Sequence, residues 1–110
     1  MKILYVENDA VFASVVVAEF LRNHEVVVVP TVAQAIDRVQ AERFAAALVD
    51  YDLDDGKGCT VVRALRRLGF RGRIVAVSSH QVGNTALREA GADDVCPKLS
   101  FAQISDHLSD

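Results

Sequence analysis

The sequence predicts an α/β fold in which helices pack on both faces of a five-stranded parallel sheet. Three observations predict it. Short runs rich in β-branched residues alternate along the chain with segments whose apolar residues recur at helical spacing. The run at residues 45–49 is apolar throughout, as expected of a strand covered on both faces. Right-handed crossovers between successive strands would make the strands parallel.

The predicted strands are short apolar runs bounded by polar or turn-forming residues. Their β-branched composition favours strands over helices at this length. The central strand is followed by an acidic loop that contains glycines, and the last strand is followed by Pro97. The five runs cover residues 2–6, 25–29, 45–49, 73–78 and 94–96.

Helices are expected between the strands and after the last one. Asp9 suits a helix N-cap, Thr31 and Ser100 each open a capping box, and Gly91 marks a helix end. The expected helices cover residues 10–22, a segment from 31, residues 60–68, residues 84–90 and a segment from 100. Apolar residues at helical spacing are expected in the core, among them Phe12, Val15, Val16, Phe20, Val61, Leu65, Leu68, Phe101, Ile104 and Leu108.

Composition and charge exclude several function classes. The 110 residues suffice for one domain, 1–110, and a formal net charge of −3 argues against direct nucleic-acid binding. The arginines at 63, 66 and 67 are expected on a solvated helix face. The first residues lack the apolar core of a signal peptide, and no stretch reaches the roughly 20 apolar residues of a membrane span. We therefore expect a cytoplasmic protein in which Cys59 and Cys96 are reduced and partly buried.

The most informative stretch is AAALVDYDLDDGKG, residues 45–58, where an apolar run ends in carboxylates and then in glycines. Asp50 directly follows the central strand, and ligands of open α/β sheets bind beyond the carboxyl ends of the strands. An EF-hand loop is rejected, because its sixth and twelfth positions would be Asp55 and Val61 instead of Gly and Glu. Three interpretations of the loop remain. It could belong to a phosphohydrolase, since DYDLD resembles the motif of haloacid-dehalogenase-type enzymes. It could also contain a phosphoryl-accepting Asp, or it could be an exposed acidic turn without chemistry.

The other strand ends carry residues that suit phosphoryl transfer. Glu7 and Asn8 follow the first strand, Ser78 ends the fourth, and Lys98 follows the fifth. Acidic groups can hold Mg²⁺, which neutralises phosphoryl oxygens. A carboxylate can act as the nucleophile, while a hydroxyl and an ammonium can hold the remaining oxygens. The order of these residues along alternating strands, and no single one of them, favours a phosphoryl-accepting site.

Taken together, these strand ends resemble those of the receiver domain of two-component response regulators, and the resemblance covers essentially the whole sequence. The resemblance implies a flavodoxin-like, doubly wound sheet with strand order 2-1-3-4-5. It also implies phosphorelay signal transduction, in which a partner histidine kinase or histidine phosphotransfer protein donates a phosphoryl group and a downstream protein target or a missing output domain responds. Such a domain is no enzyme beyond assisting its own phosphorylation and dephosphorylation. The matching stretches are ILYVEND, ALVDYDLDDGKG, RIVAVSSH and GADDVCPK.

The resemblance implies a role for each residue that matches the family's phosphorylation motif. Asp50 becomes the phosphoacceptor, which would carry an aspartyl phosphate. Ser78 becomes the switch hydroxyl, and Lys98 becomes the phosphate-binding cation. His80 and the side chain of Asp52 would lie near the phosphoryl group, where they could tune its hydrolysis.

The resemblance also implies a Mg²⁺ site. Its ligands would be Glu7, Asn8, Asp50 and the backbone carbonyl of Asp52. Most family members carry an acid at the position of Asn8. An amide oxygen can still coordinate, but the site loses one negative charge, so we expect Mg²⁺ to bind weakly.

Two further departures from the family pattern concern the end of the chain. Leu99 follows Lys98 where the family usually has Pro across a cis bond. A cis bond to a non-proline residue costs about 3 to 4 kcal/mol, so we expect a trans bond. Val95 takes a position where an aromatic ring often moves with the switch hydroxyl. Together with Asn8, these departures motivate an alternative function: a phosphorylation-independent pseudo-receiver, an interaction module with a degraded metal site.

Overall fold

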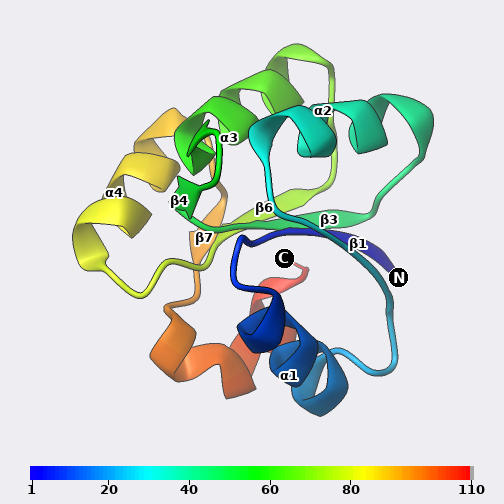
Figure 1. The fold of residues 1–110 in the computed structure, drawn as a ribbon, viewed down its shortest axis with the longest axis vertical. Helices are drawn as coiled ribbons and strands as arrows, with labels where there is room; N and C mark the ends of the chain where they lie inside the picture. Colours follow the sequence, from blue (N-terminus) through cyan, green and yellow to red (C-terminus); the bar gives the residue numbers. More distant parts are fainter. Residues whose placement is uncertain (110) are drawn as a thin grey trace.

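The main sheet is parallel and five-stranded. The computed structural model describes residues 1–109. An antiparallel hairpin that the sequence did not predict, β4 (Asp52–Leu53) with β5 (Gly56–Lys57), follows the central strand. When the five strands of the main sheet are numbered without the two hairpin strands, their order is the predicted 2-1-3-4-5. In spatial order the main sheet consists of β2 (Glu25–Val29), β1 (Lys2–Val6), β3 (Ala46–Val49), β6 (Arg73–Ala76) and β7 (Asp94–Val95) (Figure 1).

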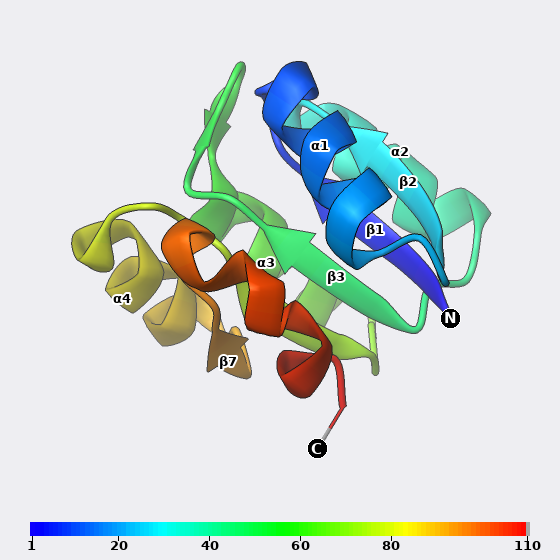
Figure 2. The same ribbon diagram turned by 90° about the horizontal axis from the view of Figure 1, so that it is seen from below.

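Helices cover both faces of this sheet, as predicted (Figures 1 and 2). The helices on one face are α2 (Val32–Ala41), α3 (Gly58–Arg67) and α4 (Gln81–Ala90), and those on the other are α1 (Ala10–Phe20) and the 3₁₀ helix η1 (Lys98–His107). Within residues 1–109, none of the helices has the length and apolar character needed to cross a membrane.

The central strands are buried on both faces. The residues of β3 are fully buried, which explains why this run is apolar throughout. Along β1, Leu4 and Val6 pack in the core with α2 and α3, whereas Ile3 and Tyr5 pack in the core with α1 and η1. β2 was also expected to be buried, but it lies at the sheet edge and only Val29 is buried there. Both cysteines are buried and free, as predicted.

The parallel register aligns the carboxyl ends of four strands. Val6 pairs with Val49, Val49 with Ala76, and Ala76 with Val95. The pairing continues one residue further, because the N–H of Asp50 donates to the carbonyl of Val6 at 3.0 Å. The residues that follow these strands therefore emerge at one edge of the sheet.

Helix α1 ends two residues earlier than predicted and buries only part of the predicted face, namely Val16 and, partly, Phe12. Ala13 and Val16 point into the core, but Val15 and Phe20 are 52% and 36% exposed. The prediction that these two residues are core residues was wrong. Nearly every position of AVFASVVVAEF is apolar, so the helical spacing of apolar residues does not single out one face.

The boundaries of α3 and α4 also differ from the prediction. Leu68 is 48% exposed and lies just after α3, so its assignment to the core was wrong. Phe70 packs against the core instead, and its N–H donates to the carbonyl of Leu65 at 2.9 Å. α4 begins three residues earlier than expected and ends at Gly91, whose φ of 128° favours glycine. The fourth and fifth strands are shorter than predicted by two residues and one residue.

The last helix is a 3₁₀ helix whose predicted capping box is absent. It begins at Lys98, directly after Pro97, so Ser100 lies inside it at a kink with φ −108° and ψ 18°. This kink separates two short helical pieces, but within residues 1–109 the Ser100 hydroxyl accepts no backbone hydrogen bond, so it caps neither of them. Every peptide bond in the described residues is trans, as expected for Lys98–Leu99. The three apolar residues assigned to the core are buried, namely Phe101, Ile104 and Leu108.

Helix caps account for several acidic and hydroxyl side chains. Asp9 accepts a hydrogen bond from the N–H of Phe12, and Thr31 caps α2, both as predicted. Asp55 was not expected to cap a helix. Its two carboxylate oxygens accept from the N–H groups of Val32 and Ala33 at 2.6 and 3.1 Å. These backbone donors lower the pKa of Asp55 and fasten the acidic loop to α2.

One arginine assigned to a solvated surface has a structural role. Arg66 is half-buried, and its guanidinium donates to the carbonyl of Gly91 and lies 2.6 Å from Asp93 Oδ2. Asp93 in turn accepts from the N–H of Ile74 at 2.8 Å. Arg66 therefore joins α3 to the segment between α4 and β7, a contact between segments that helical periodicity does not reveal.

Asp94 ties η1 to the last strand of the sheet. Its Oδ2 lies 2.6 Å from His107 Nδ1 and 3.3 Å from the Arg73 guanidinium, and its Oδ1 accepts from the N–H of Val95. Burial raises the pKa of Asp94, but the hydrogen bonds from His107 and Val95 and the charges beside it outweigh burial, so the pKa is lowered.

We expect Asp94→Asn to lower the free energy of unfolding at pH 7 by about 1 kcal/mol. A carboxyl with a lowered pKa stabilises the fold above its ordinary value of 3.8, and this stabilisation is lost as the pH falls through the lowered pKa. The difference between the two proteins should therefore shrink as the pH falls below 3.8. Urea unfolding at pH 7 and at low pH measures it, with exposed Asp106→Asn as the control. An equal loss at both pH values would contradict this account.

Candidate functional site

Three charged side chains from three strand ends meet at the carboxyl edge of the sheet. Lys98 Nζ lies 2.7 Å from Glu7 Oε1 and 3.1 Å from Asp50 Oδ2. The Glu7 side chain is fully buried, and those of Asp50 and Lys98 are 9% and 18% exposed. The structure thus brings together three candidate residues that are more than 40 positions apart in the sequence.

One ammonium between two carboxylates leaves this cluster with a net negative charge. Burial raises the pKa of Glu7, and the charge of Asp50 raises it further, while the Lys98 ammonium and the hydrogen bond from the Asp9 N–H act in the opposite direction. Burial lowers the pKa of Lys98, but Glu7 and Asp50 more than offset burial, so the pKa is raised. Lys98 is therefore charged at neutral pH, and a further cation would balance the remaining negative charge.

The backbone around Asp50 fixes its carboxylate. The N–H of Tyr51 donates to Asp50 Oδ1 at 2.8 Å. The N–H of Gly58 donates to the carbonyl of Tyr51 at 2.6 Å, which closes the hairpin against the end of β3. A Cβ at position 58 would lie 1.9 Å from the carbonyl oxygen of Asp50. Glycine is required here by this close approach of two backbones.

Asn8 and Asp52 add two further oxygen ligands that would suit a weakly bound Mg²⁺. Asn8 Nδ2 lies 3.5 Å from Asp54 Oδ1, so the amide nitrogen faces that carboxylate and the amide oxygen faces away from it. The Asp52 side chain pairs with Lys57 across the hairpin, which leaves its carbonyl as the candidate ligand. No group of three His, Cys, Asp or Glu residues within 1–109 is placed to hold a metal ion. Two carboxylates, an amide and a carbonyl still match the oxygen preference of Mg²⁺, and the negative cluster favours a cation.

Ser78 is held by a residue that the sequence analysis missed. The N–H of Ser78 donates to Asn84 Oδ1 at 2.8 Å, and Asn84 Nδ2 donates to the carbonyl of Ser78 at 2.9 Å. Both residues are buried. Asn84 stood at the start of the predicted fourth helix, where its spacing of six residues from Ser78 gave no signal of pairing. These two hydrogen bonds between the Asn84 side chain and the Ser78 backbone fix the chain between β6 and α4.

The hydroxyl of Ser78 lies in a crowded place. Its oxygen accepts from the N–H of His80 at 3.2 Å. A Cβ at Gly83 would lie 2.9 Å from Ser78 Oγ and 2.9 Å from the Cβ of Tyr51, so these side chains approach the same point. Ser78 is thereby beside the residue that follows Asp50. The side chain of His80 is exposed and occupies the N-cap position of α4 without capping it.

The chain matches the family model of the response regulator receiver domain over residues 3–108. It belongs to this family. Receiver domains are signalling modules of two-component systems. In this chain the carboxyl edge of the sheet brings Glu7, Asp50 and Lys98 together. A search of curated protein sequences gives no match.

Solved receiver domains share this fold. The BeF3-activated N-terminal receiver domain of RstA from Klebsiella pneumoniae is 28% identical, with a TM-score of 0.84 and 100% of both chains covered. The receiver domain of the sensor histidine kinase PA1611 from Pseudomonas aeruginosa, with a magnesium ion in its active site cleft, is 28% identical, with a TM-score of 0.87 and coverage of 97% and 93%. TrrA from Thermotoga maritima, in complex with Mg²⁺ and BeF, has a TM-score of 0.85, 16% identity and coverage of 96% and 93%, a likeness of fold alone.

We expect Asn84→Ala to lower the free energy of unfolding by about 2 kcal/mol, because it removes two buried hydrogen bonds and leaves the N–H of Ser78 unpaired. The carbonyl of Ser78 keeps the hydrogen bond from the Lys98 N–H at 3.4 Å. Denaturant unfolding measures the loss. The exposed neighbour Thr85, changed to Ala, is the control and should change stability little. A loss of the same small size in both variants would mean that Asn84 does not hold Ser78.

Proposed function

We propose that this receiver domain accepts a phosphoryl group on Asp50 from a histidine kinase or histidine phosphotransfer protein and thereby switches a protein-interaction surface. The position of Lys98, between Glu7 and Asp50 at the carboxyl edge, carries the proposal. One carboxylate would satisfy a structural ion pair. Two buried carboxylates around one ammonium cost stability, and such arrangements are typical of functional sites.

In the proposed reaction, a carboxylate oxygen of Asp50 attacks the phosphorus of a phosphohistidine. The phosphorus–nitrogen bond breaks, its electron pair stays on the imidazole, and an acyl phosphate forms on Asp50. Lys98 lies 3.1 Å from Asp50 before the reaction, so its ammonium is near the oxygens that it would bind afterwards. The hydroxyl of Ser78 would bind another phosphoryl oxygen.

The Mg²⁺ of this proposal would be held by Glu7, Asp50, the amide oxygen of Asn8 and the backbone carbonyl of Asp52. When bound, it neutralises charge on the phosphoryl oxygens. The magnesium ion of the PA1611 receiver domain and the BeF3 of the RstA receiver domain support the proposal, since both relatives are 28% identical to this chain. Asn8 supplies no charge, so weak binding is expected.

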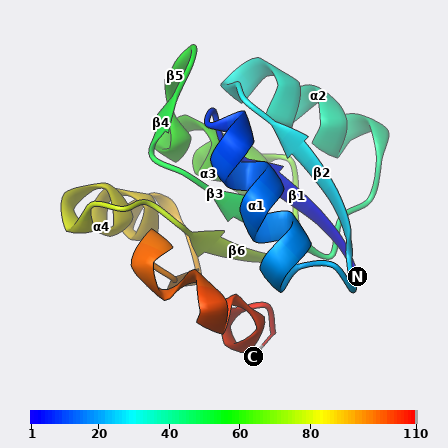
Figure 3. The ribbon, with the colours of Figure 1, turned by 60° about the horizontal axis from the view of Figure 1, so that its bottom comes forward.

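An apolar rim around the site supports a protein as the phosphoryl donor. Val11, Val82 and Leu99 are 76%, 79% and 99% exposed. They stand in the first turns of α1, α4 and η1, the helices around the edge of the sheet at which Asp50 emerges (Figure 3). Large apolar side chains exposed at the starts of these three helices are available for burial by a protein partner. A helical donor could bury this rim while it presents its histidine to Asp50.

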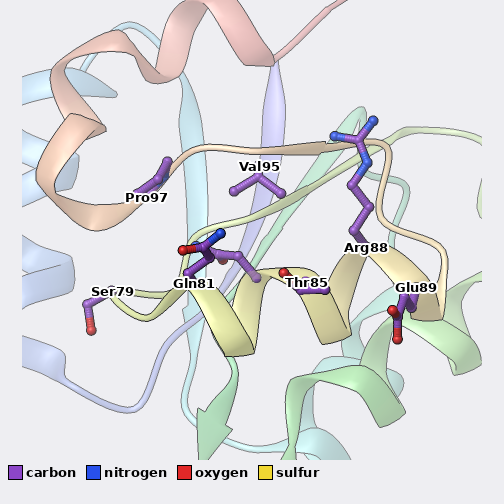
Figure 4. Close-up of a pocket in the computed structure, with 8 residues that line it drawn as sticks. Ser79, Gln81, Thr85, Arg88, Glu89, Val95 and Pro97 are labelled. Atoms are coloured by element: carbon purple, nitrogen blue, oxygen red, sulfur yellow. The ribbon is translucent and has the colours of Figure 1, made fainter.

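The groove between α4 and β7 supports the proposed output surface. It has a volume of about 530 Å³, and Figure 4 shows it between side chains of α4 and the segment with Val95 and Pro97. The backbone of Ser78 is joined to α4 through Asn84, so a shift of that backbone when the hydroxyl binds a phosphoryl oxygen would move one wall of the groove. A downstream protein target, or an output domain, would contact the face formed by α4, β7 and η1.

The domain is proposed to act in the cytoplasm without membrane or direct nucleic-acid contacts, and to be no enzyme beyond its own phosphorylation and dephosphorylation. A phosphohydrolase would turn over a generic aryl phosphate, which this domain should not do. The pseudo-receiver is the second candidate. Asn8 and the lack of a three-residue metal group within 1–109 favour it.

Intact mass after incubation with acetyl phosphate and Mg²⁺ tests the proposal. We expect the wild type to gain one phosphoryl group, and Asp50→Asn to gain none because the nucleophile is removed. Asn8→Asp restores a negative charge to the metal site, so it should give a larger yield at the same Mg²⁺ concentration.

Removal of Mg²⁺ with EDTA should abolish the adduct on the wild type and on Asn8→Asp. An adduct that persists in Asp50→Asn would place the acceptor elsewhere. No adduct on the wild type, with an adduct on Asn8→Asp, would favour the pseudo-receiver.

A further inference from the structure

Neither packing nor the proposed phosphoryl transfer accounts for the hydroxyl of Tyr5. The side chain is fully buried on β1, and its ring centroid lies 5.9 Å from that of Phe101. The hydroxyl oxygen is enclosed and has no hydrogen-bond partner among residues 1–109. A buried hydroxyl without a partner costs free energy, and a phenylalanine would pack in the same space without that cost.

A second buried oxygen lies two residues further along the chain. Within the described residues, Glu7 Oε1 is the only other enclosed side-chain oxygen or nitrogen without a hydrogen bond, although Lys98 Nζ is 2.7 Å away as an ion pair. The strand remains extended here, because the N–H of Glu7 donates to the carbonyl of Val29. Side chains two apart on a strand project from the same face. An unpaired donor therefore stands beside an acceptor with free capacity.

We infer that Tyr5 is a positioning residue whose hydroxyl donates a hydrogen bond to the buried carboxylate of Glu7. The inference rests on the proposed function, in which Glu7 is a Mg²⁺ ligand. Burial and the charges of Glu7 and Asp50 raise the pKa of Tyr5, so the hydroxyl keeps the proton that it would donate.

Such a donor is useful because Lys98 has two tasks. Its ammonium is the cation closest to Glu7 before phosphorylation. Once it binds a phosphoryl oxygen on Asp50, the protein donor that remains for Glu7 is the N–H of Asp9, which donates to Oε2 at 3.0 Å. A hydroxyl fixed in the core would hold the other oxygen throughout, and hydrogen bonds to charged acceptors are the stronger ones.

Melting temperatures of the metal-free protein test the hydrogen bond. Tyr5→Phe removes one oxygen atom, and we expect it to lower the melting temperature of the wild type. In a Glu7→Leu background the acceptor is gone, so Tyr5→Phe should leave the melting temperature unchanged or raise it. A rise in both backgrounds would mean that the hydroxyl is unpaired, and it would overturn the inference.

Glu7→Gln serves if Glu7→Leu does not fold. Its neutral amide oxygen is a weaker acceptor than a carboxylate, so the loss caused by Tyr5→Phe should be smaller than in the wild type. An equal loss in both backgrounds would overturn the inference.

Metal affinity separates positioning from packing. We expect Tyr5→Phe to raise the dissociation constant for Mn²⁺, measured by calorimetry at pH 7, by about 10-fold, as outer partners of metal ligands do. Phe101→Leu loosens the packing around the ring but keeps the hydroxyl, so it should lower the melting temperature and leave this constant unchanged. An unchanged constant in Tyr5→Phe, or an equal increase in both variants, would overturn the inference.

The outcomes for Tyr5 and for the proposed function can be told apart. The melting temperatures require neither metal nor phosphoryl transfer. An acetyl phosphate adduct on Asp50, together with a higher melting temperature of Tyr5→Phe in both backgrounds, overturns the role of Tyr5 alone. A missing adduct, with the expected loss confined to the background that retains Glu7, overturns the proposed function alone.

Discussion

A single ammonium between two buried carboxylates is the interaction on which the site depends. Lys98 Nζ also lies 4.8 Å from the centroid of the Phe12 ring, so the cation is surrounded by Glu7, Asp50 and an aromatic face. The cluster keeps one unbalanced negative charge in a place with little water. Because Lys98 is the first residue of η1, any ligand that draws its ammonium away from Glu7 acts on the start of that helix.

The doubly covered sheet makes this interaction possible. Its central strands are buried on both faces, and their register brings their carboxyl ends level with one another. A one-residue slip would turn every side chain of a strand to the other face, so the hydrophobic cores fix the register. Residues that follow aligned strands then lie close together whatever their separation in the chain. The hydrophobic cores thus determine the relative positions of the site residues.

The four carboxylates of the acidic loop after β3 each contact a different partner. Asp50 faces Lys98, Asp52 pairs across the hairpin, Asp54 lies beside an asparagine amide, and Asp55 caps α2. Only the first stands in the charged cluster. Gly58 allows the hairpin to fold back onto the carbonyl of Asp50, so the loop is held at both ends. Several of these carboxylates therefore orient the loop that presents the acceptor.

The alternation of strands and helices, the burial of the central strand and the polar residues at the strand ends could all be predicted from the sequence, because hydrophobic periodicity and the order of residues along the chain are local properties. The prediction of the buried helix face was partly wrong where apolar residues do not mark one face, as in α1, whose residues are apolar on nearly every side. The pairing of Ser78 with Asn84, the capping of α2 by Asp55 and the enclosed hydroxyl of Tyr5 were decided by tertiary structure alone. Each is a contact or an environment created by packing, and no spacing along the chain encodes it.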